Sequence, residues 1–152
     1  MKIFTKQETI AISLILLVIA IISFFNFKVA LRRGRDNERK NDLSDIAKVL
    51  DDYKSKNSIY PESLSVIKNL PKDPGTPQGF SYLYLTDGKF FQLYASLEGK
   101  TDEAEYNPKI NALNLKCGNF ICNFGKASGS VPLDKSIEVY ENELDAKRLH
   151  SH

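Results

Sequence analysis

The chain has 152 residues, of which 42% are hydrophobic and 26% are charged, a composition typical of one folded domain of ordinary size. Its net charge of +2, from 21 basic and 19 acidic side chains, is too balanced to indicate nucleic acid as the main partner. Two cysteines are too few for a disulfide-dense scaffold or a four-cysteine zinc site.

An apolar segment near the N-terminus points to a membrane protein. Residues 10–27 contain no charged side chain, and the run extends over residues 9–31 if Lys28 reaches toward the lipid headgroups. A helix of about 20 apolar residues crosses a bilayer. A buried core helix would be shorter and amphipathic, and a cleaved secretory signal would have a shorter apolar region followed by a cleavage site with small residues. The sequence therefore predicts a membrane-spanning helix over residues 9–31.

The charges that flank this segment bear on its orientation. Two lysines precede it, whereas four basic residues follow its apolar core, at Lys28, Arg32, Arg33 and Arg35. Taken alone, the positive-inside rule would place the C-terminal side of the segment in the cytoplasm.

The helix is predicted to continue beyond the membrane. Between residues 10 and 56 there is no proline, and Gly34 is the single glycine. Over residues 32–58 the apolar side chains recur at the spacing of an amphipathic helix, at Leu43, Ile46, Ala47, Leu50 and Tyr53. Because Pro61 disfavours the α conformation at Tyr60, we expect the helix to end near Asn57 or Ser58.

Residues 59–133 are predicted to form a globular α+β domain, in which the amphipathic half of the helix lies across a small antiparallel sheet. Residues 62–69 are a candidate for a short helix that turns Leu64, Ile67 and Leu70 inward. Strands are expected at residues 80–85 and 89–97, joined by a hairpin at Asp87-Gly88. Residues 115–117 and 121–124 are candidates for a further short strand pair. The charged segment 134–152 is either a C-terminal helix or a tail.

Two stretches of the first 61 residues form a recognisable pattern. The first is Phe4-Thr5-Lys6-Gln7-Glu8, followed directly by the apolar run, and the second runs from Arg35 to Leu43 and leads to Ser58-Ile59-Tyr60-Pro61. In these stretches the chain resembles the type IV pilin and type II secretion pseudopilin family. Mature members of the family begin with phenylalanine and carry glutamate at the fifth position. Ile3 stands where members carry glycine or alanine before the cleavage point, so residues 1–8 combine a very short leader with the N-terminal motif.

The resemblance implies a pilin-like α+β fold and a structural role without catalysis. The chain would be a subunit of a type IV pilus-like filament or of a type II secretion pseudopilus, assembled through its hydrophobic N-terminal helix with other copies of itself and with related pilins. It would depend on a prepilin peptidase, an assembly ATPase and a membrane platform protein. It would be a single-pass cytoplasmic membrane protein with an exported C-terminal domain, extracellular or periplasmic once assembled, which opposes the charge count around the membrane segment.

Phe4 and Glu8 are the residues that the resemblance assigns to processing and assembly. A carboxylate at the edge of an apolar helix is costly unless it is paired. In pilins this glutamate is thought to pair with the terminal amine of a neighbouring subunit. The alternative for Glu8 is an ordinary hydrated carboxylate at headgroup level.

Cys117 and Cys122 are predicted to form a disulfide if the domain is exported, because an even pair this close outside the cytoplasm most often does so. In a cytosolic domain, two buried free thiols would be the expected state. The spacing is not the two-residue gap of a redox or zinc motif.

Calcium is the candidate ion, although no cofactor is required by the proposed role. Hard oxygen ligands gather after the second predicted strand, at Glu98, Asp102, Glu103 and Glu105. Major pseudopilins bind calcium on a late loop of this kind. The spacing is not that of an EF-hand, and a solvated acidic loop is the alternative.

Signatures of enzymes are absent from the sequence, including phosphate-binding loops, the nucleophile elbow and the His-Glu-x-x-His motif. The chain is therefore expected not to be an enzyme. The second function that the sequence leaves open is a membrane-anchored binding module that does not polymerise, or a minor pilin that serves adhesion or DNA uptake.

Overall fold

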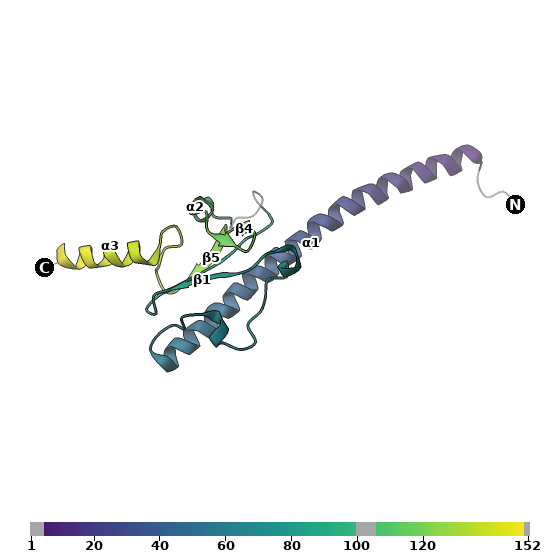
Figure 1. The fold of residues 1–152 in the computed structure, drawn as a ribbon. Helices are drawn as coiled ribbons and strands as arrows, with labels where there is room; N and C mark the ends of the chain where they lie inside the picture. Colours follow the sequence, from purple (N-terminus) through teal and green to yellow (C-terminus); the bar gives the residue numbers. More distant parts are fainter. Residues whose placement is uncertain (1–4, 100–105, 151–152) are drawn as a thin grey trace. The chain divides into compact units, whose positions relative to one another are not determined.

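A computed structural model describes residues 5–99 and 106–150 of the chain (Figure 1). The chain divides into two compact units, residues 1–34 and residues 35–152, and the long helix α1 (Lys6–Asn57) contributes to both. The other elements belong to the second unit: the 3-10 helices η1 (Leu64–Val66) and η2 (Thr76–Gln78), the strands β1 (Leu83–Thr86), β2 (Phe91–Ala95), β3 (Lys116–Cys117), β4 (Phe120–Ile121) and β5 (Phe124–Ala127), and the helices α2 (Pro108–Ala112) and α3 (Ile137–His150).

The first unit is the N-terminal part of α1, and every side chain over residues 5–31 is exposed to solvent. In the described part of the chain, α1 alone is long and apolar enough to cross a membrane. The hydroxyls of Thr9 and Ser13 donate to carbonyls one turn earlier in the helix, so these polar groups need no water. This unit is consistent with a single-pass membrane protein.

The core of the second unit lies where α1 packs on the sheet. Leu43, Ile46 and Leu50 of α1 are completely buried, and they form one cluster with Phe91 and Leu93 of β2. The apolar residues that recur at helical spacing in the sequence therefore form the buried face of α1. The α+β class, with a long N-terminal helix packed on a small antiparallel sheet, is confirmed.

The end of α1 agrees with the prediction from the Tyr60-Pro61 pair. The helix stops at Asn57, and Ser58 takes a positive φ of 68°. The N–H of Tyr60 then donates to the carbonyl of Gly88 at 2.8 Å, which joins the helix end to the β1–β2 hairpin. The segment predicted as a short helix forms the single turn η1, and the three side chains expected to face inward pack against the core: Leu64, Ile67 and Leu70.

The main sheet is antiparallel in the order β1-β2-β5, with Leu83 opposite Tyr94 and Tyr94 opposite Gly125. The predicted hairpin turn forms, since the carboxylate of Asp87 accepts the N–H groups of Lys89 and Phe90 at 2.8 and 2.7 Å. β2 is buried over its whole length. Its second face packs in a separate cluster with the two cysteines.

The remaining elements surround this second face. β3 pairs with β4 in a two-stranded sheet of its own, whereas β5 joins the main sheet, so the predicted strand over residues 121–124 is divided between β4 and β5. α2 was not expected from the sequence, although Asn107 caps it and Pro108 begins it. The C-terminal segment forms α3, which contacts the hairpin through the rings of Phe90 and Tyr140.

Candidate functional site

The first candidate site is the start of α1, where Thr5 and Glu8 form a capping box. A carboxylate oxygen of Glu8 accepts the N–H of Thr5 at 2.7 Å, and the hydroxyl of Thr5 accepts the N–H of Glu8 at 3.3 Å. This reciprocal pair satisfies two N–H groups that the helix leaves unpaired. Glu8 therefore has a structural role within its own chain. Phe4 lies outside the described residues.

The capping box uses one carboxylate oxygen of Glu8 and does not neutralise the negative charge of the side chain. Within the described ranges, the second oxygen, Oε1, has no hydrogen-bond partner. The carboxylate also lies in the first turn of the helix, where the positive end of the helix dipole favours a negative charge. The side chain can thus cap its own helix and still offer an acceptor to a cation.

Cys117 and Cys122 form the expected disulfide, which closes the β3–β4 hairpin. Both cysteines are completely buried, in one cluster with Tyr94 and Ile110. Gly118 in the turn has a φ of 73°, and a Cβ there would lie 2.1 Å from the carbonyl oxygen of Gly79. The turn therefore requires glycine, and it holds the hairpin directly against residues 79–81.

A buried group of charges, which the sequence analysis did not identify, fixes the start of the second unit. Arg39 of α1 is completely buried, and its Nε donates to both oxygens of Asp73 at 3.0 and 3.1 Å. Its Nη1 donates to Asp36 at 2.7 Å and to Glu98 at 2.9 Å. Its guanidinium lies over the ring of Phe80, 4.4 Å from the ring centre. We refer to Asp36, Arg39, Asp73 and Glu98 as the charge cluster.

The charge cluster also holds the end of β2 against α1. The carboxylate of Asp36 accepts the N–H groups of Glu98 and Gly99, both at 2.9 Å. Arg35 makes a two-bond pair with Glu98 at 2.6 and 2.8 Å. The hydrogen bond from Arg35, together with the charge of Arg39, holds the pKa of Glu98 below its usual value.

These contacts bear on the calcium hypothesis, because Glu98 was one of the four proposed ligands. Its carboxylate is occupied by two arginines in this structure. The other three, Asp102, Glu103 and Glu105, lie outside the described residues. Among the residues that are described, no group of three metal-binding side chains occurs. Calcium binding stays a prediction.

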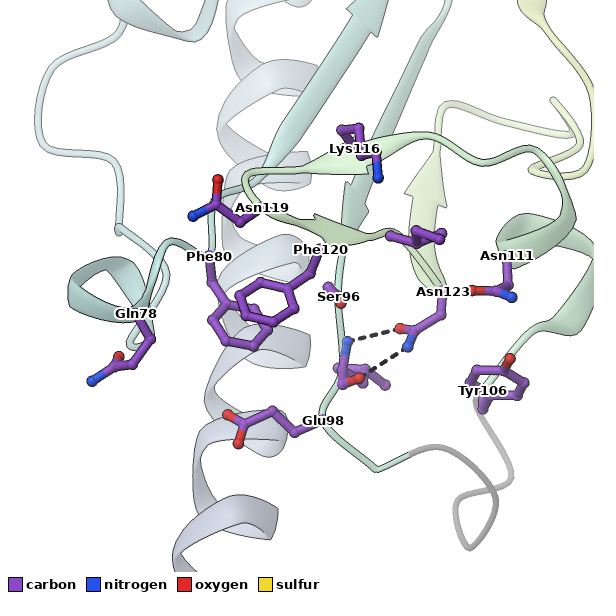
Figure 2. Close-up of a pocket in the computed structure, with 12 residues that line it drawn as sticks. Gln78, Phe80, Ser96, Glu98, Tyr106, Asn111, Lys116, Asn119, Phe120 and Asn123 are labelled. Atoms are coloured by element: carbon purple, nitrogen blue, oxygen red, sulfur yellow. Dashed lines mark hydrogen bonds between the residues drawn. The ribbon is translucent and has the colours of Figure 1, made fainter.

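The second unit also contains an open pocket of about 790 Å³ (Figure 2). Its base is the end of β2 and the residues after it, and its walls are the disulfide hairpin on one side and α2 with Tyr106 on the other. The lining residues are Gln78, Phe80, Ser96, Leu97, Glu98, Tyr106, Asn111, Lys116, Asn119, Phe120, Ile121 and Asn123.

Hydrogen bonds and a ring stack between segments that are far apart in the sequence hold the framework of this pocket. The amide of Asn123 accepts the N–H of Leu97 at 2.7 Å and donates to its carbonyl at 2.9 Å. The N–H of Asn119 donates to the carbonyl of Gly79 at 2.8 Å. The rings of Phe80 and Phe120 stack with centres 3.8 Å apart and planes 14° from parallel. The pocket is therefore built before any ligand arrives.

Comparisons of the chain with protein-family models, curated proteins and solved structures returned no match.

Proposed function

We propose that this chain is a single-pass, type IV pilin-like subunit that assembles into a filament or pseudopilus through its N-terminal helix. The observation that carries the proposal is the difference in burial between the two parts of α1. Residues 5–31 bury no side chain in the chain itself, whereas residues 43–50 supply the core of the second unit. One helix thus offers an apolar surface for other helices and a rigid support for a globular domain.

Assembly follows from the physical chemistry of the exposed segment. In the membrane its apolar side chains contact lipid, and in a filament they would contact the same segment of neighbouring copies, so the apolar surface stays out of water in both states. Extraction from the bilayer then requires an energy source. The resemblance supplies this as an assembly ATPase acting with a membrane platform protein, after processing at Phe4 by a prepilin peptidase.

Glu8 is the residue that favours the packed state over the isolated anchor. Its free carboxylate oxygen and its charge can bind the terminal amine of a neighbouring chain, which the resemblance to pilins assigns to it. An exposed bridge contributes about 0–1 kcal/mol, and the attraction between two charges grows as they are withdrawn from water. An isolated anchor has no such partner.

Export of the second unit is part of the proposal. The buried disulfide supports it, since disulfides persist in oxidising compartments outside the cytoplasm. Calcium on the acidic loop after Glu98 would be an accessory to this role and not a requirement.

The experiment that tests the proposal is purification of sheared surface filaments from cells that produce the full chain with its own assembly system. We expect the chain to form the repeating subunit of these filaments, seen by immunogold labelling and mass spectrometry. If the chain stays in the membrane fraction as a monomer while the assembly system is active, the polymerising role is wrong.

That outcome would favour the second candidate function, an anchored binding module or minor pilin. The specific observation in its favour is the preformed pocket at the disulfide hairpin, which a purely structural subunit does not need.

A further inference from the structure

The pocket of Figure 2 presents an aromatic surface whose position is fixed in advance. Phe80 is 9% exposed, whereas its stacking partner Phe120 is 38% exposed, so the pair shows one open ring at the pocket. The open ring therefore offers an apolar surface to a ligand inside the pocket.

The hairpin that carries Phe120 cannot easily withdraw the ring. The disulfide closes the hairpin, Phe80 makes a backbone bridge with Gly118, and the N–H of Asn119 is bonded to Gly79. A ring held in this way loses little conformational entropy when a ligand packs on it.

The polar lining of the pocket consists mainly of neutral amides. The side chains of Gln78 and Asn119 lie on one side of the ring pair, and those of Asn111 and Tyr106 lie on the other (Figure 2). Within the described residues, none of these four side chains has a hydrogen-bond partner. A terminal amide offers donors and an acceptor, which matches a hydroxyl group that both donates and accepts.

Few charges take part in the described lining of the pocket. Glu98 is already paired with Arg35 and Arg39, and among the described lining residues Lys116 is the one cation. The neutral amides and the open ring make up most of the described lining, and they match a ligand that is rich in hydroxyl groups and apolar on one face. A pyranose ring has these properties, because its C–H groups pack on the negative face of an aromatic ring while its hydroxyls point outward.

We propose that this pocket binds a neutral saccharide, with one sugar ring packed on Phe120 and its hydroxyls bonded to the amides of Asn111 and Asn119. A cavity of about 790 Å³ falls within the usual size of small-molecule sites. The proposal does not depend on polymerisation, since the pocket lies within the second unit of a single chain.

The test uses the full chain in lipid nanodiscs, which avoids detergents that carry sugars. The probes are cellobiose, chitobiose, maltose and lactose, together with an uncharged extended peptide, each titrated and followed by saturation-transfer NMR. We expect saturable binding of at least one disaccharide and transfer from aromatic protons to the sugar. If none of the four disaccharides binds, or if the peptide binds in their place, the proposal is wrong.

Variants locate the binding. Asn111→Ala removes an amide at the end of a short helix, where alanine is well tolerated, and Phe120→Leu keeps an apolar side chain against Phe80. Each should weaken binding about tenfold through the lost hydrogen bond or ring face. Asn142→Ala, on exposed α3 outside the pocket, is the matched control and should leave binding unchanged. Unchanged binding in both pocket variants would place the sugar elsewhere and overturn the assignment.

Discussion

Arg39 on the long helix and Asp73 on the loop before β1 form a completely buried ion pair, although 34 positions separate them in the chain. The guanidinium donates through Nε to both carboxylate oxygens, and its Nη1 reaches two further carboxylates of the charge cluster. Three segments of the second unit thus meet at one side chain. The charge cluster joins the helix to the loop and to the end of β2 at the point where the second unit begins.

The first prediction is that Arg39→Met destabilises the second unit strongly. The change leaves Asp36 and Asp73 buried without their cation, which costs about 3–5 kcal/mol. Lys48→Met is the control, because Lys48 forms an exposed bridge to Asp45 and should cost less than about 1 kcal/mol. Denaturant unfolding of the full chain in nanodiscs, followed by near-UV circular dichroism, measures both. Equal losses in the two variants would show that the cluster does not organise the unit.

A second prediction concerns the stability of the second unit at low pH. The pKa of Glu98 is lowered in the folded chain from 4.5, chiefly by the hydrogen bond from Arg35. A lowered folded pKa means that this group's contribution to stability is complete above the unfolded value and is lost as the pH falls through the folded value. Stability should therefore decline below about pH 4.5. In Glu98→Gln this part of the decline should be missing. If the free energy of unfolding of Glu98→Gln falls below pH 4.5 as steeply as that of the unchanged chain, the lowered pKa of Glu98 is not the cause.

Removal of the disulfide is expected to have a moderate effect. The loop between Cys117 and Cys122 is short, so the chain-entropy model gives a loss of about 2 kcal/mol for Cys117→Ala with Cys122→Ala. The domain should still fold, with a lower melting temperature. Intact mass after alkylation without reductant checks the native state, which should contain no free thiol. Two alkylated thiols in freshly isolated chain would contradict both the disulfide and export.

The orientation of the chain has its own test. Because the second unit is proposed to be exported, protease added to intact spheroplasts should digest the chain beyond Pro61. A cytoplasmic protein in the same cells controls for leakage. Protection of the domain until the membrane is broken would mean that the positive-inside count describes this protein correctly.

The features that the sequence predicted are those set by local pattern. The buried face at Leu43, Ile46 and Leu50 follows from a helical period, the end of α1 follows from Pro61, and the hairpin follows from Asp87-Gly88. Each of these signals lies within a few residues of its effect.

The features that were missed depend on pairing across the chain. Asp36 and Arg39 continue the buried stripe of α1 toward its N-terminal side. From the sequence alone, charged residues at these positions are expected to be solvated, because their partner Asp73 lies far away in the chain. The pocket requires residues 79–81 to meet the disulfide hairpin, which no local pattern indicates. The capping box is the exception, since the Thr-x-x-Glu spacing that forms it stands in the sequence itself, at Thr5-Lys6-Gln7-Glu8.

Assembly through the charge of Glu8 is tested by separating that charge from the capping box. Glu8→Gln removes the charge, and glutamine still completes a capping box with Thr5. Thr5→Ala removes the hydroxyl of the cap and keeps the charge, at a cost of about 1 kcal/mol in helix stability. Asp45→Asn, on an exposed part of α1 in the second unit, is the control for loss of one negative charge.

The deciding measurement is a count of surface filaments against membrane-bound chain in the same cells for these three variants. We expect equal amounts of membrane-bound chain in all of them. Filaments should be sharply reduced in Glu8→Gln, and they should be close to normal in Thr5→Ala and Asp45→Asn. Normal filaments from Glu8→Gln would show that assembly does not need the charge of Glu8, and an equal loss in Thr5→Ala would show that the loss is not specific to that charge.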